Sequence, residues 1–124
     1  GVKMMKAAKE NAGRSKILAV TVLTSTEANT EQVLKLTRDA LKASIDGVVC
    51  SGHDLLDIKR ISRSKQLLKV VPGIRPSWYK KKDDQMRTMD PNKALKSGAD
   101  YLIIGRPITE SKDPARTLRK IKQT

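Results

Sequence analysis

The sequence predicts an α/β domain built from parallel βα units. Apolar runs of strand length recur at 17–23, 46–50, 67–71 and 101–104, and each is followed by a segment with apolar residues at helical spacing. Glycine, proline and aspartate separate the two kinds of segment. Strands that alternate with helices are typical of a parallel sheet. We count four strands and about five helices in one domain spanning residues 1–124, which is the length of an ordinary single domain.

The amino-terminal segment predicts a helix over residues 2–12, because apolar residues recur there every three or four positions and Gly13 follows. The apolar positions of this helix are Met4, Met5, Ala8 and Ala12. The run I-L-A-V-T-V-L at 17–23 then predicts a buried strand.

The next helix begins near Asn29, which stands three residues before Gln32 in the spacing of a capping box. Its apolar face consists of Val33, Leu36, Ala40 and Ala43. A short strand at 46–50 and a helix over about 53–64 complete this half of the chain.

The second half repeats the pattern around a long polar loop at 74–89, which follows the strand 67–71 and the pair Pro72-Gly73. Asp90-Pro91 predicts a helix start, with aspartate as N-cap and proline at the first helical position. That helix ends at Ser97-Gly98, the strand 101–104 follows, and Asp113-Pro114 starts a final helix. The apolar positions of the final helix are Ala115, Leu118 and Ile121.

The composition limits the classes of function. No apolar run reaches 18 residues, so the sequence predicts no membrane span, and the basic amino terminus lacks the apolar core of a secretory signal. The single cysteine, Cys50, cannot form an internal disulfide, which fits the reducing cytoplasm. The net charge of +13 favours anionic partners, but most basic residues are lysines dispersed along the chain, and this dispersion favours a solvated surface.

The ends of the predicted strands carry polar and glycine residues. In parallel βα architectures these carboxyl ends lie on one rim, where ligands bind. Arginine matches the oxygens of a phosphate, and glycine lets backbone N–H groups approach closely. This predicts a phosphate site at Gly105-Arg106, although a simple turn with a surface ion pair fits the spacing equally well. The strand ends are Thr24-Ser25, Cys50-Ser51, Pro72-Gly73-Ile74-Arg75 and Gly105-Arg106.

Five motifs, in order along essentially the whole chain, resemble the carboxy-terminal half of bacterial orotidine 5′-phosphate decarboxylase. They are A-V-T-V-L-T-S at 19–25, D-G-V-V-C-S at 46–51, P-G-I-R-P at 72–76, D-Q at 84–85 and I-I-G-R-P-I-T at 103–109. The resemblance implies a TIM (β/α)8 barrel, of which this chain holds the second half. It also implies a lyase of de novo pyrimidine biosynthesis, which converts orotidine monophosphate to UMP and CO2 without metal or organic cofactor.

The resemblance also implies roles for individual residues. Thr24 matches a threonine that contacts the nucleotide, and Gly105 and Arg106 match phosphate ligands, as does Arg75. Gln85 matches a glutamine that reaches over the phosphate and pyrimidine from a mobile loop. The predicted loop at 74–89 is long enough to act as such a lid.

The family's catalytic Lys-Asp-Lys-Asp array, which includes a D-x-K-x-x-D motif, has no counterpart here, so we expect no catalytic residue in this chain. The nearest string, D57-I-K-R-I-S62, lacks the second aspartate and falls within a predicted helix. We therefore expect this chain to be a truncated, substrate-binding half of the barrel that does not decarboxylate orotidine monophosphate alone. A catalytically dead remnant or a nucleotide-phosphate binding module is the alternative.

A half-barrel would expose its first and last strands and its inner apolar face. We therefore expect either a complementary amino-terminal half-barrel chain or a homodimer, with aggregation as a third possibility. The retained Arg75, Gln85 and Arg106 favour the complementary chain.

Three further features are weaker signals. Trp78 and Tyr79 beside a run of lysines could stack bases, but the chain has only three aromatic residues, so we expect no specific nucleic-acid partner and no membrane partner. His53 lacks partners at metal-ligand spacing, so we expect it to be a helix cap or a surface residue. We expect Cys50, at the end of a strand, to be part of the packed core.

Overall fold

Four parallel strands form one sheet in the order β1-β2-β3-β4 in the computed structural model, which describes residues 1–27 and 29–123. Each strand pairs with the one before it along the chain; for example, Ala19 of β1 lies opposite Val48 of β2. This confirms the predicted parallel βα arrangement. The strands are β1 (Leu18–Val20), β2 (Gly47–Val49), β3 (Leu68–Val71) and β4 (Tyr101–Leu102).

The outer strands β1 and β4 are shorter than the predicted 17–23 and 101–104. Each has a neighbour on one side only, so fewer of its residues are held in a ladder. Hydrogen bonds continue one residue beyond each, from Thr21 N–H to the Val49 carbonyl (3.0 Å) and from Ile103 N–H to the Val71 carbonyl (2.9 Å).

The helices of the described residues are six, not five, and two short 3₁₀ turns accompany them. The additional helix is the single turn α5, which follows β4 directly. The helices are α1 (Val2–Glu10), α2 (Thr30–Lys42), α3 (Leu55–Lys59), α4 (Pro91–Ser97), α5 (Arg106–Thr109) and α6 (Pro114–Lys122), and the turns are η1 (Gly52–Asp54) and η2 (Ser64–Gln66).

Local capping signals place several helix ends. The side chains of Asp90 and Asp113 accept hydrogen bonds from backbone N–H groups at the starts of α4 and α6, as predicted. Asn29 caps α2 by accepting from Glu31 N–H at 2.8 Å, but among the described residues the reciprocal bond from Asn29 N–H to the Gln32 side chain is not formed. Gly98 ends α4 with a φ of 108°, the left-handed conformation expected of a terminal glycine.

The predicted helix over 53–64 is wrong in length. The chain makes the turn η1 and only five residues of α3 before it bends, and Arg63 then adopts a left-handed φ of 67° before η2. A capping box between Ser51 and Asp54 fixes the start of η1. The sequence after Lys59 has no helix-ending glycine, so the bend was not visible as a local signal.

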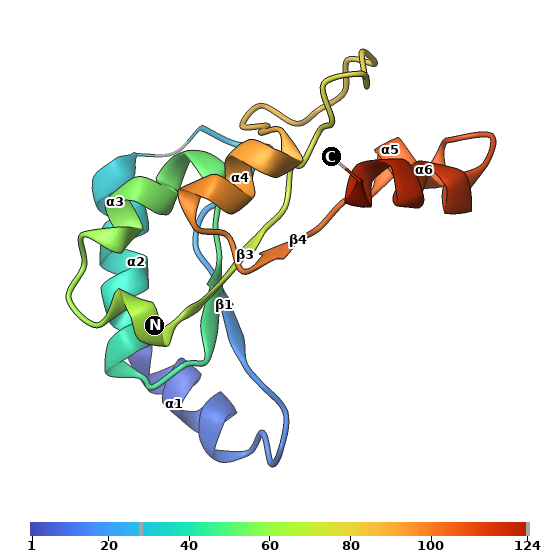
Figure 1. Ribbon diagram of the computed structural model, residues 1–124. Coiled ribbons are helices and arrows are strands. Elements are labelled where there is room, and N and C mark those ends of the chain that lie inside the picture. Colours follow the sequence, from blue (N-terminus) through green and yellow to red (C-terminus); the bar gives the residue numbers. More distant parts are fainter. Residues whose placement is uncertain (28, 124) are drawn as a thin grey trace.

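The core lies between the sheet and the helices α2, α3 and α4, which cover one of its faces (Figure 1). Leu55 and Ile58 of α3 are fully buried there, together with Val48 and Val71 of the sheet. Each such side chain contributes about 1.5–3 kcal/mol when it is removed from water. Of the apolar face predicted for α2, Val33, Ala40 and Ala43 are buried, while Leu36 is only partly buried.

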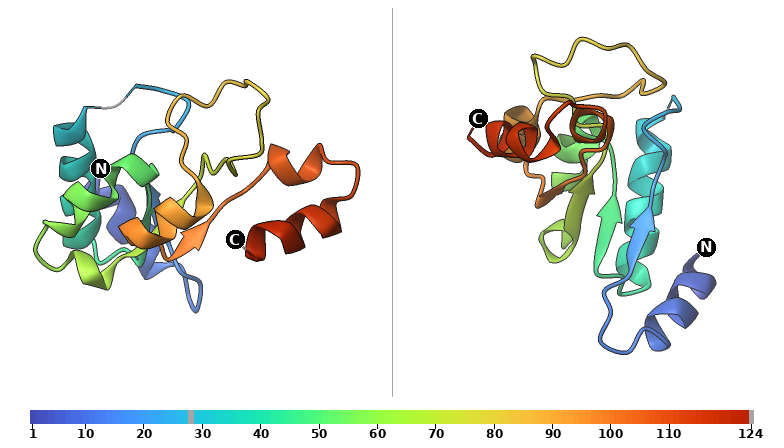
Figure 2. Two further views of the ribbon diagram at one scale, coloured as in Figure 1. Left: turned by 45° about the horizontal axis from the view of Figure 1, so that its top comes forward. Right: turned by 90° about the vertical axis from the view of Figure 1, so that its right-hand side faces the viewer.

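The last part of the chain extends away from this core. In Figures 1 and 2, α5 and α6 lie apart from the layer formed by α2, α3 and α4. Consistent with this position, Leu118 of α6 is 42% exposed, whereas Ile121 is buried. The outer strands are also exposed, with Val20 on β1 at 56% and Tyr101 on β4 at 60%. The predicted apolar edges are therefore present.

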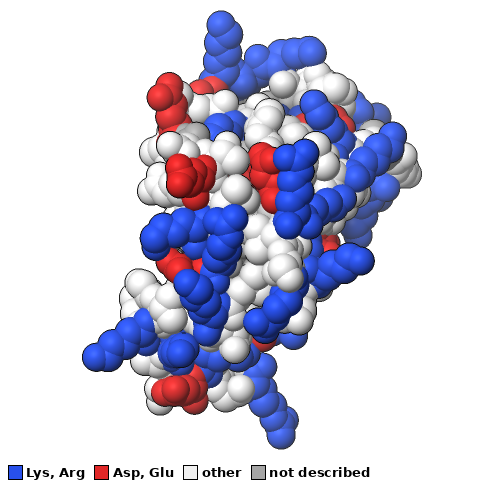
Figure 3. Space-filling view, turned by 90° about the vertical axis from the view of Figure 1, so that its left-hand side faces the viewer, with Lys and Arg blue, Asp and Glu red and all other residues white. Residues whose placement is uncertain are grey.

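The positive charge is dispersed on the face that carries α2 and α3. Figure 3 shows lysine and arginine side chains spread over this face and interrupted by acidic and uncharged residues. Within the described part of the chain, no helix is long and apolar enough to cross a membrane. The same residues contain no group of three or more metal-binding side chains.

Candidate functional site

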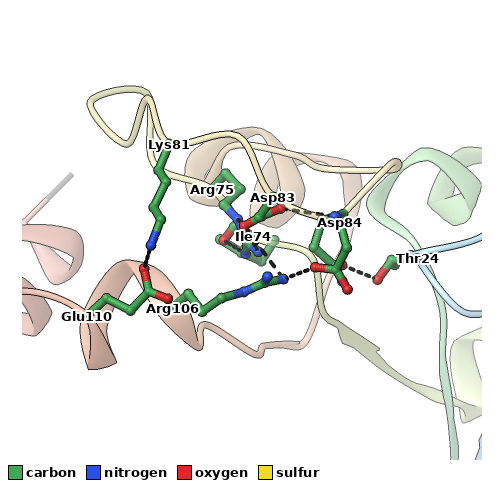
Figure 4. Close-up of polar contacts among 9 residues, drawn as sticks. Thr24, Ile74, Arg75, Lys81, Asp83, Asp84, Arg106 and Glu110 are labelled. Carbon is green, nitrogen blue, oxygen red and sulfur yellow. Dashed lines mark hydrogen bonds and ion pairs between the residues drawn. The ribbon is translucent and has the colours of Figure 1, made fainter.

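The long loop, residues 74–89, connects β3 to α4 and brings three of the predicted site residues together. Arg75 lies at its start and Gln85 near its end, and Arg106 approaches the loop from the first turn of α5 (Figure 4). Thr24 reaches the same loop from the segment after β1. Residues from three strand ends therefore meet at one side of the sheet.

Backbone hydrogen bonds hold the two ends of the long loop together. Arg75 N–H donates to the Met89 carbonyl (2.9 Å), and Met89 N–H donates to the Gly73 carbonyl (3.2 Å). Gly73 has a φ of 71°, and a Cβ there would lie 3.0 Å from the Arg87 carbonyl oxygen. Glycine is required at this position both for the left-handed backbone and for the close approach of the returning chain.

Thr24 is 6% exposed and binds the end of the long loop through two groups, its hydroxyl and its carbonyl oxygen. Its hydroxyl donates to Gln85 Oε1 at 2.6 Å. Its carbonyl oxygen accepts from the N–H groups of Met86 (3.2 Å) and Arg87 (3.0 Å). The predicted Thr24 and Gln85 are thus in direct contact, and the strand end positions the glutamine.

Arg75 forms a partly buried ion pair with a residue of the same loop. Its Nε and Nη2 both donate to Asp83 Oδ2, at 3.0 and 2.7 Å, and its Nη1 donates to the Ile74 carbonyl at 3.0 Å. The side chains of Arg75 and Asp83 are only 12% and 9% exposed. The guanidinium also lies against the Tyr79 ring, 5.6 Å from its centroid.

Arg106 completes a cluster of two guanidinium and two carboxylate groups, which we call the arginine–carboxylate cluster (Arg75, Asp83, Asp84 and Arg106). Arg106 Nη2 lies 2.5 Å from Asp84 Oδ1 and 3.6 Å from Asp83 Oδ2. Just before it, Gly105 faces open space, because a Cβ there would meet nothing within 4 Å. The backbone at this point is therefore accessible to a ligand.

The electrostatics of the cluster stabilise its charged forms. Burial raises the pKa of Asp83, but the hydrogen bond from Gln85 N–H and the charges of Arg75 and Arg106 outweigh burial and hold this pKa below its ordinary value. The hydrogen bond to Asp84 raises the pKa of Arg106. Two arginines within reach of the same acidic pair can also bind the oxygens of a phosphate.

Two hollows lie near the long loop. One of about 390 Å³ is bordered by Arg106, Tyr79 and Lys81, and so adjoins the cluster. A larger one of about 540 Å³ lies between Trp78 and α6 and is lined by basic residues, but none of the predicted site residues borders it. The smaller hollow is therefore the better candidate for ligand space.

Asp83 was not predicted as a site residue, and Asp84 was quoted in the D-Q motif without a role, although both directly precede Gln85. Two acidic residues beside a predicted phosphate ligand were the available signal. The pairing of Lys81 with Glu110 of the segment after α5, at 2.5 Å, was also not predicted. This exposed pair ties the loop tip to the end of α5.

The weaker candidates do not form a second site. Cys50 is 1% exposed, and burial together with the nearby Asp54 charge raises its pKa to about 12, so it is packed core. His53 lies at the surface, with Nε2 at 2.8 Å from the Thr88 carbonyl oxygen. Asp57 lies on α3 and pairs with Arg60 at 3.6 Å, which agrees with the interpretation of D57-I-K-R-I-S62 as a helical coincidence.

Comparison with known proteins gives consistent matches. The profile of the orotidine 5′-phosphate decarboxylase / HUMPS family matches residues 1–121. The chain is 45% identical to an orotidine 5′-phosphate decarboxylase of Dichelobacter nodosus, with 100% of this chain and 60% of the relative covered. It is 42% identical to that of Saccharophagus degradans, with 98% of this chain and 56% of the relative covered.

A solved structure shows the same fold. The crystal structure of orotidine 5′-phosphate decarboxylase from Lactobacillus acidophilus superposes with a TM-score of 0.76 at 33% sequence identity. The match covers 99% of this chain and 58% of that one. The chain thus spans little more than half the length of the relatives it matches, and its four strands correspond to part of a barrel.

Proposed function

The chain belongs to the orotidine 5′-phosphate decarboxylase / HUMPS family, and we propose that it provides the phosphate-binding half of an orotidine 5′-phosphate decarboxylase. The proposed overall reaction converts orotidine monophosphate to UMP and CO2 in the cytoplasm, as a step of pyrimidine biosynthesis. The observation that carries the proposal is the meeting of Arg75, Arg106, Gln85 and Thr24 at one side of the sheet.

In this proposal the two arginines bind the phosphate of the nucleotide. Arg75 and Arg106 are both within 4 Å of one carboxylate oxygen, Asp83 Oδ2, so their guanidinium groups can serve one small anion. The exposed backbone at Gly105 gives that anion a further approach. Gln85, held by Thr24, would then lie over the nucleotide. These groups orient the substrate, and no proton transfer is assigned to them.

The reacting groups must come from outside these 124 residues. The sequence contains no D-x-K-x-x-D motif. The two aspartates of the site are engaged by arginines rather than lysines. We therefore propose that this chain alone does not decarboxylate orotidine monophosphate, and that a complementary half-barrel supplies the lysine and aspartate groups.

The exposed strands provide a place for that half to dock. Val20 on β1 and Tyr101 on β4 are more than half exposed, and both strands have an unpaired edge. A groove of about 370 Å³ also runs beside β1, lined by Met4, Met5, Leu18, Val20 and Leu36 among others. A parallel strand against each edge would pair the free backbone groups and cover these apolar side chains. A second copy of this chain is the other candidate partner.

Binding of UMP to the purified chain, measured by calorimetry at physiological salt, tests the proposal. We expect UMP to bind more tightly than inorganic phosphate, and Arg106→Ala to abolish the binding. A chain that binds UMP no better than phosphate would contradict a preformed nucleotide site. A chain that binds UMP but gains no activity with any partner would instead support the alternative, a nucleotide-phosphate binding module.

A complementation assay tests the catalytic part. The portion of the Dichelobacter nodosus relative that lies outside the match is co-expressed with this chain, and decarboxylation of orotidine monophosphate is measured. Activity in the pair but in neither part alone is the expected result. The same pair carrying Arg106→Ala is the control, since it should assemble but bind substrate poorly.

A further inference from the structure

We propose that Asp83 and Asp84 divide two tasks in the arginine–carboxylate cluster: Asp83 holds the arginines in place, and Asp84 occupies Arg106 until a dianionic phosphate ester displaces it. This inference rests on the proposed function, because it assumes that the cluster binds phosphate. It adds roles for two residues to which the family resemblance assigned none, although Asp84 belongs to the D-Q motif at 84–85.

Asp83 has the contacts of a permanent positioning residue. It accepts two hydrogen bonds from Arg75 and one from Gln85 N–H at 3.0 Å, and Arg106 lies within ion-pair distance. Its side chain is 9% exposed. Three hydrogen bonds hold this partly buried carboxylate, so Asp83 leaves Arg75 far less readily than an exposed carboxylate with a single partner would.

Asp84 has the opposite character. Its side chain is 69% exposed and, among the described residues, its only ion-pair partner is Arg106, whose side chain is 35% exposed. Exposed ion pairs of this kind contribute little to stability, so they exchange easily. Asp84 can therefore swing into solvent at little cost, and its oxygen at 2.5 Å from Arg106 Nη2 stands where a ligand oxygen could bind.

The charges of the cluster determine which anions can replace Asp84. Two arginines balance two aspartates, so the cluster is neutral as it stands. Release of Asp84 leaves one net positive charge, held by Arg106 and the fixed Arg75–Asp83 pair. A phosphate monoester at pH 8 is a dianion because its second pKa is about 6, whereas a sulfate monoester is a monoanion like the carboxylate. The dianion is attracted to Arg106 about twice as strongly as the carboxylate that it replaces, whereas the monoanion has no such advantage.

The experiment compares Asp84→Asn with a charge-matched control. Glu110→Gln removes one negative charge from the neighbouring Lys81 pair and leaves the cluster intact. Binding of methyl phosphate and methyl sulfate to the full chain is measured at pH 8 by calorimetry. The single tryptophan, Trp78, lies in the long loop and reports its movement by fluorescence. Circular dichroism verifies that each variant is folded.

We expect Asp84→Asn to bind methyl phosphate about two- to five-fold more tightly than the wild type, as loss of a weak competing ion pair predicts. Because Asp84 competes with any anion for Arg106, methyl sulfate should also bind more tightly to Asp84→Asn, by a similar factor, and Glu110→Gln should change neither affinity by as much. Asp83→Asn should instead weaken binding of both anions. The exchange is overturned if Asp84→Asn and Glu110→Gln behave alike, or if no variant binds methyl phosphate.

The result can be separated from a failure of the proposed function. The proposed function depends on the preference of the wild type for UMP over inorganic phosphate. The proposed displacement of Asp84 depends on a different quantity, the ratio between the methyl phosphate affinities of Asp84→Asn and the wild type. A chain with no preference for UMP can still show the exchange, and a chain that prefers UMP can still lack it.

Discussion

Replacing Gly73 by alanine tests how the base of the long loop is built. Gly73 has a φ of 71°, and an added Cβ would lie 3.0 Å from the Arg87 carbonyl oxygen and 3.4 Å from both Gln85 Oε1 and Thr24 Cβ. The substitution therefore forces an alanine into the left-handed region and pushes against the returning chain. Both effects act on the segment that positions Gln85.

The magnitude follows from adding the two effects. The left-handed conformation costs alanine about 1–2 kcal/mol. Crowding against a backbone carbonyl, which is held by neighbouring hydrogen bonds, adds about 1–3 kcal/mol of overpacking. We expect a total loss of about 2–5 kcal/mol in the free energy of unfolding. For a chain of this length this lowers the melting temperature by roughly 3–6 °C per kcal/mol.

Gly13 provides the matched control. It also has a positive φ, of 57°, but a Cβ there would meet nothing within 4 Å. Gly13→Ala should therefore cost only the conformational part of the effect, about 1–2 kcal/mol. Urea denaturation of both variants gives the comparison. If Gly73→Ala were no more destabilising than Gly13→Ala, the proposed close packing at the base of the loop would be refuted.

Three further predictions concern the core, the thiol and the loop. Leu55→Ala should lower the free energy of unfolding by about 2–5 kcal/mol, because Leu55 is fully buried, and urea denaturation measures it. Cys50 should react slowly with iodoacetamide at pH 8, because burial raises its pKa to about 12. The depressed pKa of Asp83 stabilises the loop above the ordinary aspartate value of about 4, and this contribution is lost as the pH falls through the lower folded pKa. Fluorescence of Trp78 should therefore change below about pH 4.

Each of these predictions has an internal comparison. Leu56 is 62% exposed on the same helix, so Leu56→Ala should cost far less than Leu55→Ala, and equal costs would contradict the burial argument. Chain unfolded in urea should lose the protection of Cys50, and rapid labelling of the folded chain would exclude a packed thiol. Asp83→Asn should remove the acid transition, and a transition that persists in that variant would assign it to another group.

The predicted helix ends that were confirmed depend on contacts within four residues. Asp90 before Pro91 and Asp113 before Pro114 each cap a helix through their own backbone neighbourhood, so the sequence contains the whole signal. Gly98 ends α4 for an equally local reason. The alternation of apolar runs likewise predicted the sheet, because each strand pairs with the next one along the chain.

The features that were missed depend on contacts between distant residues. Asp84 meets Arg106 across the gap between the long loop and α5, and no spacing rule links the two positions. Arg75 and Arg106 were predicted as site residues, but not the carboxylates that hold them. The extent of α3 was overestimated because the chain leaves the helix after Lys59 and then adopts a left-handed backbone at Arg63, and neither residue type gives a local warning.

The two free sheet edges have a consequence for the symmetry of any assembly. The β1 edge and the β4 edge are different surfaces, so two copies joined through them form a head-to-tail contact, which either closes into a ring or continues as a filament. Closure after two copies requires each to span half a turn of an eight-stranded barrel. The two-fold axis of such a ring would run along the barrel, and both arginine–carboxylate clusters would then lie at the same mouth. Dynamic light scattering across concentration would separate a finite ring from an open filament.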